Sequence, residues 1–315
     1  MRILITGGAG FIGSHLADHF LAAGHEVAVL DNLVSGKLEN LAGARVMFFQ
    51  VDIRDKAAVM AAFEQFKPEV VSHHAAQMSV KGSTDNPTYD AQCNVLGLIN
   101  VLEAAVAVKA RKVIFASSGG TVYGDSPIIP SPEDAPLLPM SPYGITKMVG
   151  EHYLGYFHQA FGLDYTVFRY GNVYGPRQDP HGEAGVVAIF AKKLMRGEAP
   201  IIHWDGEQRK DYVHVKDVAR ANVLALTGGS GHAFNIGSGV ATSVNELFAG
   251  LELQLQTGIM PHYGPKREGD VRLSYLSVDK IADRLGWRPQ VGLADGMVDT
   301  VAYFRQQVAR EVTTG

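Results

Sequence analysis

The sequence has almost no cysteine and no excess of positive charge, and both absences narrow its function. Cys93 is the single cysteine among 315 residues, so an intrachain disulfide and a thiolate metal cluster are excluded. The formal net charge of −4 lacks the basic excess that binding a nucleic-acid backbone needs, so we expect no nucleic-acid partner. The adjacent His73 and His74 have no further ligands clustered with them, so we expect no metal site.

Long apolar runs and repeats are missing as well. No stretch approaches the roughly 20 apolar residues that a membrane span requires. The first residues lead directly into a glycine turn, unlike a signal peptide. We therefore expect a cytoplasmic protein without a membrane partner. The 35 glycines follow no short period, and 46% hydrophobic with 19% charged residues is typical of a compact enzyme.

Up to about residue 175, short apolar runs alternate with helical patterns. We expect strands at residues 3–5, 27–30, 46–49, 70–74, 113–116 and 166–169, and helices at 11–22, 56–66, 94–108 and 143–161. This alternation predicts an α/β fold, a doubly wound parallel sheet of the Rossmann type. We predict a dinucleotide-binding domain of residues 1–175, to which 211–240 return, and a smaller α/β substrate-binding domain of residues 176–210 and 241–315.

A glycine-rich loop, GGAGFIG at residues 7–13, follows the first expected strand and opens the first helix. Gly7 permits the tight turn, Gly10 leaves room for a pyrophosphate, and Gly13 lets helix and strand pack closely. The helix N-terminus offers unpaired N–H groups to the phosphates. Asp31 ends the second strand about 20 residues later, the usual distance. Its carboxylate suits a ribose 2′-hydroxyl and repels a 2′-phosphate, so we predict NAD and not NADP.

Other strand ends carry small or polar residues. Asp52, after the third strand, is placed to meet the adenine, with an ordinary turn aspartate as the alternative. Ala75, Ala76 and Gln77 follow the fourth strand and offer small side chains where the cofactor backbone passes. Ligands of such sheets bind just beyond the carboxyl ends of the strands, so these positions are candidates for cofactor contacts.

Tyr143 and Lys147 are four residues apart and share one face of an expected helix. Ser141 is a good N-cap and Pro142 fits the first helical position. A Tyr-x-x-x-Lys pair alone is common on protein surfaces. This pair follows the serines that end the fifth strand of a dinucleotide fold, and that position indicates proton transfer at a redox centre.

These motifs together resemble the extended short-chain dehydrogenase/reductases, and among them the UDP-glucose 4-epimerase family. The matching segments are GGAGFIG at 7–13, DNL at 31–33, SSGGTVYG at 117–124, YGITK at 143–147, RYGNVYGPR at 169–177 and REGD at 267–270. The resemblance implies an isomerase of galactose metabolism that binds NAD and a UDP-sugar, and epimerises a UDP-hexose through a transient 4-keto sugar. It also implies a homodimer packed through residues 94–108 and 143–161, with Val106, Tyr153 and Phe157 on the outer faces.

The resemblance assigns roles to individual residues. Tyr143, Lys147 and Ser118 are the expected catalytic residues; Ser117 and Thr121 are alternatives to Ser118, because the family's hydroxyl residue falls on Gly119. Expected cofactor contacts are Gly7, Gly10, Phe11, Ile12, Gly13, Asp31, Asn32, Ser35, Gly36, Asp52, Ile53, Ala75, Ala76, Gln77, Asn94, Ser117, Tyr143, Lys147 and Tyr170. Expected substrate contacts are Ser118, Gly119, Tyr143, Asn172, Val187, His203, Arg209, Lys210, Arg267, Asp270 and Ser274.

An ionised Tyr143 at neutral pH requires help from positive charges. Tyrosine titrates near 10, so its pKa must fall by about 3, which is about 4 kcal/mol. One cation about 6 Å away contributes on the order of 3 kcal/mol. We expect Lys147 and the positive nicotinamide ring to act together, since neither alone is sufficient.

Two positions narrow the reaction. Related dehydratases carry Asp-Glu, and decarboxylases tend to carry a glutamate, where this chain has Gly120 and Thr121. Elimination then lacks a proton carrier, whereas 4-epimerisation needs none beyond Tyr143. A UDP-glucuronate 4-epimerase on the same scaffold is the main alternative. A non-catalytic dinucleotide sensor is a remote one, because such proteins typically lack the tyrosine or the lysine.

Two departures from the family concern the substrate. Arg209-Lys210-Asp211 replaces Thr-Arg-Asp, so either Lys210 binds the diphosphate as a point charge or Arg209 turns in. Ser274 stands where epimerases restricted to glucose and galactose often have a tyrosine. The small side chain leaves room for a 2-acetamido group, so we expect UDP-N-acetylglucosamine and UDP-N-acetylgalactosamine to be substrates as well.

Overall fold

The computed structural model describes residues 1–180, 185–266 and 271–314. Its larger part is a seven-stranded sheet in the order β10-β6-β5-β4-β1-β2-β3, in which every neighbouring pair is parallel. The strands are β1 (Arg2–Thr6), β2 (Glu26–Asp31), β3 (Met47–Gln50), β4 (Val70–His73), β5 (Lys112–Ser118), β6 (Asp164–Tyr170) and β10 (His232–Ile236). The predicted doubly wound sheet is confirmed.

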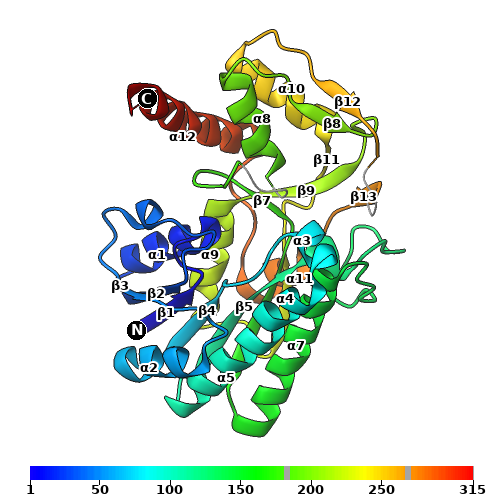
Figure 1. Cartoon of the computed structure of the whole chain (residues 1–315). Coiled ribbons are helices and arrows are strands. Elements are labelled where there is room, and N and C mark those ends of the chain that lie inside the picture. The colour runs from blue at the N-terminus through cyan, green and yellow to red at the C-terminus, as the bar shows by residue number, and fades with distance from the viewer. Residues whose placement is uncertain (181–184, 267–270, 315) are drawn as a thin grey trace.

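Helices cover both faces of this sheet (Figure 1). Ile3 and Ile5 of β1 pack in the cluster that contains α1 and α9, whereas Leu4 packs in the cluster that contains α2, α5 and α7. Both faces of the strand are therefore apolar, as its continuous apolar run predicts. The helices are α1 (Phe11–Ala22), α2 (Lys56–Phe66), α5 (Gly97–Ala107), α7 (Pro142–Phe161), α9 (Val215–Ala225) and α11 (Asp279–Leu285), with η1 (Leu38–Leu41), α3 (Val80–Asp85), α4 (Pro87–Ala91) and α6 (Gly119–Val122) in the connections.

The helix expected at residues 94–108 does not run as one regular α-helix. Residues Gln92–Leu96 form a π-helical turn, η2, before α5 begins at Gly97. The side chain of Asn94 is 3% exposed and donates a hydrogen bond to Thr146 on α7, at 3.2 Å. Such turns are frequent at functional sites, and periodicity of apolar residues does not reveal a one-residue widening.

The inner face of α7 differs from the one we expected. Phe157, expected on an outer face, is 5% exposed and packs in the sheet core, because the inner stripe runs through Gly150, Leu154 and Phe157. Tyr156 is the exposed neighbour, at 56%. Apolar residues lie on two stripes of this helix, and spacing alone does not tell which stripe faces the core.

A smaller unit lies beyond one end of the large sheet (Figure 1). Its apolar cluster is formed mainly by α8 (Val186–Met195), α10 (Val244–Leu255) and α12 (Leu293–Thr314). Its short strands are β7 (Asn172–Tyr174), β8 (Ile201–His203), β9 (Arg209–His214), β11 (Ala241–Ser243), β12 (His262–Gly264) and β13 (Leu273–Ser274). Strand β9 pairs with β7, β11 and β13, and leads directly into α9, which packs on α1. In the described residues no helix is long and apolar enough to cross a membrane.

Candidate active site

The glycine loop lies beyond the carboxyl end of β1, between β2 and β4, where the strand order reverses and ligands bind. A Cβ on Gly7 (φ +69°) would lie 2.6 Å from the backbone N of Ala75, and one on Gly13 would lie 2.3 Å from the Gly7 oxygen. A Cβ on Gly10 would have one neighbour within 4 Å, the Gly7 oxygen at 3.2 Å, and the position is otherwise open. Gly10 begins α1 without a side-chain cap. The uncapped N–H groups and the open space fit a pyrophosphate.

Asp31 ends β2 beside this loop. Its carboxylate accepts hydrogen bonds from the N–H groups of Ala9, at 3.0 Å, and Leu33, at 2.8 Å. A Cβ on Gly36 would lie 2.7 Å from a carboxylate oxygen, so the loop after β2 folds back on it. Burial raises the pKa of Asp31, and the two hydrogen bonds lower it. An acceptor at this place fits the hydroxyl donors of a ribose.

Asp52 is held firmly by its neighbours. Arg54 donates from Nε and Nη2 to the two carboxylate oxygens, at 2.9 and 2.8 Å, and Asn32 donates from Nδ2 at 2.9 Å. The Arg54 hydrogen bonds hold the pKa of Asp52 well below its usual range. Ile53 is buried in the core, against α5. Asp52 is therefore a fixed anion at the β2–β3 side of the site, and Ile53 has its side chain in the core.

The segment after β4 joins the glycine loop to the π-turn. The Gln77 N–H donates to Asn94 Oδ1 at 2.8 Å, and Asn94 Nδ2 donates back to the Gln77 carbonyl at 3.0 Å. Ala75 packs against Gly7, and Ala75, Ala76 and Gln77 are all half-buried. The structure thus brings five predicted cofactor contacts from three separate segments to one place.

Tyr143 and Lys147 lie at the start of α7, beside the carboxyl end of β5. Lys147 is 4% exposed; its Nζ donates to the Ala116 carbonyl at 2.8 Å and lies 5.7 Å from the centre of the Tyr143 ring. The side chain of Ser118 lies close enough to the Tyr143 hydroxyl to lower its pKa through a hydrogen-bonding interaction. The three residues that the sequence singled out for catalysis therefore stand together.

The protein alone does not make Tyr143 acidic. Burial raises the pKa of Tyr143 to about 12, against the hydrogen bond with Ser118, which lowers it. Burial also lowers the pKa of Lys147 to about 8. For Tyr143 to ionise at neutral pH, its pKa must therefore fall by more than the decrease of about 3 that the sequence suggested. An ionised Tyr143 at neutral pH would therefore require positive charge that the described side chains alone do not supply.

In the described residues, neither of the other candidate hydroxyls has a hydrogen bond to Tyr143. Ser117 donates to Glu151 Oε1 at 2.6 Å. A Cβ on Gly119 would lie 2.7 Å from the side chain of Leu276, so a serine at this position would have to displace Leu276. Thr121 Oγ1 is buried and finds no hydrogen-bond partner in the described part of the chain. The geometry favours Ser118 as the partner of the tyrosine.

Tyr170 ends β6 and pairs in register with Ser118. Its hydroxyl accepts a hydrogen bond from Asn222 Nδ2 at 2.9 Å and shares a 3.0 Å contact with His74 Nε2. Burial lowers the pKa of His74 to about 3, so this histidine is neutral. Within the described ranges, no group of three or more histidine, cysteine or acidic side chains is suited to a metal ion.

Strand β9 places the two candidates for the diphosphate contact differently. The guanidinium of Arg209 donates to Glu246 at 2.9 Å and to a backbone carbonyl at 3.1 Å, so it is fastened to α10. Lys210 pairs in register with Ser274 of β13. Lys210 also has contacts of its own, so both alternatives stay open.

The other predicted substrate contacts of the second part of the chain that the structure describes lie in the smaller unit. Asn172 is exposed on β7 and donates to a carbonyl of β9 at 3.2 Å. His203 is half-buried at the end of β8. Val187 is 1% exposed in the core of the smaller unit, so only its backbone is left for a ligand. Arg267 and Asp270 lie outside the described residues.

Comparison with known proteins identifies the family. The NAD dependent epimerase/dehydratase family matches residues 3–237. The chain belongs to this family. The UDP-glucose 4-epimerase of Mycolicibacterium smegmatis is 47% identical over 312 residues, which are 98% of this chain and 99% of the relative.

Solved structures give the same family. The crystal structure of UDP-glucose 4-epimerase from Thermotoga maritima with UDP-glucose has a TM-score of 0.96 and 48% identity, covering 98% of this chain and 100% of the other. The Thermus thermophilus UDP-glucose 4-epimerase in complex with NAD has a TM-score of 0.91 and 46% identity, covering 97% and 99%. The predicted epimerase family, its NAD dependence and its fold are confirmed.

Two buried carboxylates of this family member escaped the sequence-based prediction. Glu151 on α7 forms an ion pair with Arg169 of β6, at 2.7 Å, with both side chains nearly buried. Asp90 on α4 accepts a hydrogen bond from Asn94 at 3.0 Å. A spacing of four residues was the available signal, because Glu151 follows Lys147 by four and Asp90 precedes Asn94 by four.

Proposed function

We propose that this protein is an NAD-dependent UDP-glucose 4-epimerase, which interconverts UDP-glucose and UDP-galactose. The observation that carries the proposal is the group of Ser118, Tyr143 and Lys147 beside a glycine loop that fits a dinucleotide. The relatives from Mycolicibacterium smegmatis, Thermotoga maritima and Thermus thermophilus support the substrate and the cofactor.

The two parts of the chain divide the binding work. Residues 1–171 with α9, β10 and α11 form the proposed NAD-binding domain, since these three elements pack on the large sheet or its helices. Strand β7, residues 176–210 and those from 241 onward, apart from α11, form the proposed nucleotide-sugar-binding domain. Strand β9 belongs to the smaller sheet by its pairing and joins the two parts.

The chemistry of the chain itself is proton transfer at the sugar 4-hydroxyl. Bound NAD supplies the acceptor for the hydride of C4 and its return to the other face. Tyr143 Oη receives the proton of the 4-hydroxyl and later gives it back, with Ser118 Oγ holding the hydroxyl in line. The ammonium of Lys147, fastened to β5, stabilises the phenolate charge.

The cofactor contacts surround the glycine loop. The first turn of α1, at Phe11 and Ile12, offers its N–H groups to the pyrophosphate. Asp31 accepts from the adenosine ribose, and the loop after β2 borders the same site. The proposed contacts are Gly7, Gly10, Phe11, Ile12, Gly13, Asp31, Asn32, Ser35, Gly36, Asp52, Ile53, Ala75, Ala76, Gln77, Asn94, Ser117, Tyr143, Lys147 and Tyr170.

Residues on and beside the small sheets form the proposed binding site for the nucleotide sugar. Lys210 serves the diphosphate as a point charge, with Arg209 as the alternative, and the neighbouring Ser274 leaves room at the sugar. This small side chain supports turnover of the 2-acetamido UDP-sugars as well. Asn172, His203, the backbone at Val187, and the chain at Arg267 and Asp270 complete the proposed contacts.

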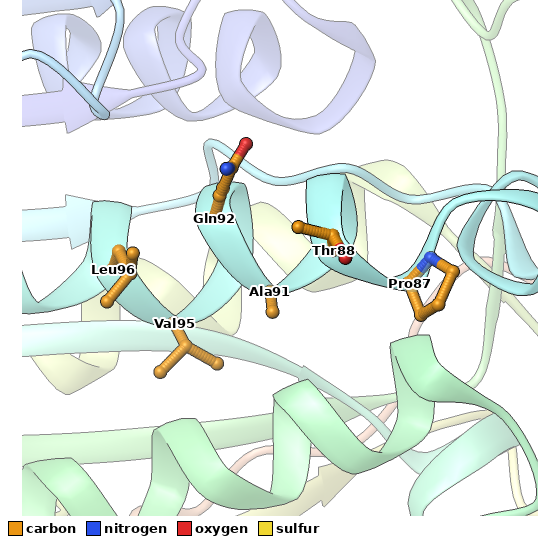
Figure 2. A pocket seen from close by; sticks show the side chains of 6 residues that line it. All are labelled: Pro87, Thr88, Ala91, Gln92, Val95 and Leu96. Atoms are coloured by element: carbon orange, nitrogen blue, oxygen red, sulfur yellow. The ribbon is translucent and has the colours of Figure 1, made fainter.

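An apolar surface supports the homodimer that belongs to this proposal. Figure 2 shows a shallow depression along α4 and η2, lined by Pro87, Thr88, Ala91, Gln92, Val95 and Leu96. Exposed apolar side chains continue from it over α7, which packs beside both elements. The most exposed are Ile145, Phe161, Leu96 and Tyr156, at 46–56%. A face this apolar on the outer helices is expected to be covered by a second copy.

A single charged residue introduced into the apolar surface tests the proposed dimer. Leu96→Glu places a carboxylate in this surface, and we expect a monomer in light scattering at a protein concentration where the wild type is dimeric. Leu253→Glu, at a 73% exposed position of α10, is the matched control and keeps the wild-type mass. A monomeric wild type contradicts the dimer.

We also propose a cytoplasmic location, since a protein with a single cysteine suits a reducing compartment. Cell fractionation checks this location.

The activity is tested on the purified protein. We expect bound NAD in the isolated protein and conversion of UDP-galactose to UDP-glucose. Tyr143→Phe abolishes turnover and keeps NAD bound, whereas Tyr153→Phe on the same helix keeps activity. Conversion of UDP-glucuronate to its 4-epimer without conversion of UDP-galactose would replace the proposed substrate. Appreciable activity of Tyr143→Phe would refute the role of the tyrosine.

A further inference from the structure

Asp90 is a fully buried carboxylate beside the site, on the short helix α4. Its Oδ1 accepts hydrogen bonds from Gln77 Nε2 at 2.9 Å and Asn94 Nδ2 at 3.0 Å, and its Oδ2 accepts one from Thr146 Oγ1 at 2.8 Å. All three donors are neutral. In residues 1–180, 185–266 and 271–314, no lysine or arginine forms a direct ion pair with this carboxylate.

Structure alone does not require a negative charge at this position. An asparagine would accept from Gln77 and Asn94 through its carbonyl oxygen and donate to Thr146 through its amide. The Thr146 hydroxyl has a second acceptor, the Tyr143 carbonyl at 3.0 Å, so it can receive that amide. A buried carboxylate with neutral partners costs more free energy than a buried amide. The charge therefore has a role that the three contacts do not explain.

The position of Asp90 points to that role. Its partner Thr146 is the residue before Lys147, and its field acts on both members of the catalytic pair. Asp90 raises the pKa of Lys147 against the lowering by burial, and it adds to the burial that raises the pKa of Tyr143.

The other groups around Lys147 carry no free negative charge. At the end of β4 lie His73 and, one residue later, His74; burial lowers the pKa of both, that of His74 to about 3, so both are neutral. From β5 come an aromatic ring, 5.1 Å from Nζ, and the carbonyl that Nζ contacts. On α7 itself, Glu151 is paired with Arg169. Asp90 on α4 is thus the one described carboxylate whose charge is left to act on the lysine.

We propose, on the basis of the proposed function, that Asp90 is a positioning residue whose buried negative charge keeps the Lys147 ammonium charged and available to the Tyr143 phenolate. A buried lysine tends to lose its proton. A neutral amine would still fill the space and still bond to β5, but it would no longer stabilise the phenolate.

The proposal has a signature in the pH profile. Removing the charge of Asp90 lowers the pKa of Lys147 and the pKa of Tyr143 together. The alkaline limb of the pH–rate profile, where Lys147 loses its proton, moves to lower pH. The acidic limb, where Tyr143 ionises, moves in the same direction. A merely structural defect lowers activity by one factor at every pH and moves neither limb.

The experiment compares Asp90→Asn with the wild-type holoenzyme. We expect both limbs of the kcat profile for UDP-galactose to shift down by about one pH unit, the smaller end of what a nearby charge produces. Bound NAD and the melting temperature stay close to the wild-type values. Asp85→Asn, at an exposed position of α3 paired with Lys81, is the matched control and leaves the profile in place.

Each outcome decides the question. A uniform loss of activity with unmoved limbs overturns the proposal and makes Asp90 structural. If Asp90→Asn does not fold, Asp90→Ser, which removes the charge and leaves room for a water, is measured in the same way and judged by the same shift. A wild type without 4-epimerase activity overturns the proposed function, whereas an active wild type with an unmoved variant overturns only the role of Asp90.

Discussion

Leu276 occupies the space that a side chain at position 119 would need: a Cβ on Gly119 would lie 2.7 Å from Leu276 Cδ1. Leu276 is 2% exposed and packs in a small cluster with Tyr123, so it has little freedom to move. Gly119 itself carries no hydroxyl, and Leu276 leaves little space for a larger side chain at this position. Ser118 stands one residue earlier and has a hydrogen-bonding interaction with the tyrosine.

Ser118→Ala is expected to lower kcat about 100-fold, the effect of losing one positioned proton-transfer group, while NAD stays bound. The hydrogen bond from Ser118 lowers the pKa of Tyr143, so the acidic limb of the pH–rate profile moves to higher pH in the variant. Steady-state kinetics over a range of pH measures both effects.

Moving the hydroxyl tests the part played by Leu276. Adding Gly119→Ser to Ser118→Ala restores little activity, because the new side chain meets Leu276. Adding Leu276→Ala as a third change makes room, and kcat recovers part of the loss. A double variant with wild-type activity would show that the position of the hydroxyl does not depend on Leu276.

Lys147→Met is expected to be inactive and more stable than the wild type. Burial lowers the pKa of Lys147 to about 8, against about 10.4 in an unfolded chain, which costs folding about 3 kcal/mol at pH 7. Losing the hydrogen bond to the β5 carbonyl removes about 1 kcal/mol of the gain. We expect the unfolding free energy at pH 7 to rise by about 1–2 kcal/mol in urea titrations.

The pH dependence of this difference has a fixed sign. The pKa of Lys147 is lower in the folded state, so the folded protein binds fewer protons between about pH 8 and pH 10. The wild type therefore gains stability relative to Lys147→Met as the pH rises through this window. A constant difference from pH 7 to pH 10 would contradict the lowered pKa.

Arg169→Leu is expected to lower the unfolding free energy by about 3–5 kcal/mol, because it leaves Glu151 as an uncompensated buried charge. The side chains of this pair are 7% and 11% exposed. Lys81→Leu breaks the exposed pair with Asp85 and is the matched control, with an expected loss below about 1 kcal/mol. Chemical denaturation of the three proteins gives the comparison.

Gly10→Ala and Gly13→Ala separate cofactor binding from packing. A Cβ at Gly10 has one contact, at 3.2 Å, so the fold tolerates it while the methyl group occupies space for the pyrophosphate. We expect NAD affinity to fall at least about tenfold with little change in melting temperature. A Cβ at Gly13 would lie 2.3 Å from a backbone oxygen, so that variant loses stability as well. Equal melting temperatures would contradict this reading of the loop.

Ser274→Tyr is expected to remove activity on UDP-N-acetylgalactosamine and to keep activity on UDP-galactose. Ser274 pairs in register with Lys210, and a tyrosine there fills the space of the acetamido group. Ser274→Thr is the conservative control and keeps both activities. A wild type that turns over UDP-galactose alone would contradict the proposed wider specificity.

The features predicted from sequence are local ones. The glycine loop, Asp31 and the pair of Tyr143 and Lys147 each lie within one short segment, where turn chemistry and helix spacing are readable. The alternation of strands and helices likewise predicted the sheet, because both of its faces are covered and its strands are continuous apolar runs.

The features that were missed join separate segments. Glu151 on α7 meets Arg169 on β6, and Asp90 meets Thr146 over 56 residues of chain. Neither residue has a motif of its own. The expected outward position of Phe157 was wrong because α7 carries two apolar stripes, and only the neighbours of the helix decide which one is inside.

The π-turn at Gln92–Leu96 has a consequence for how this scaffold tolerates change. An α-helix advances by 3.6 residues per turn, so side chains before and after a widened turn are no longer in phase. Asp90 and Asn94 keep their angle toward α7, while α5 keeps its own angle toward the sheet. The turn thus lets the residues before it and the helix after it keep different rotational positions about the helix axis. Removing one residue inside this turn would leave a regular α-helical turn and keep the angle of α5, whereas the same deletion within α5 would rotate the rest of its core stripe by about 100°.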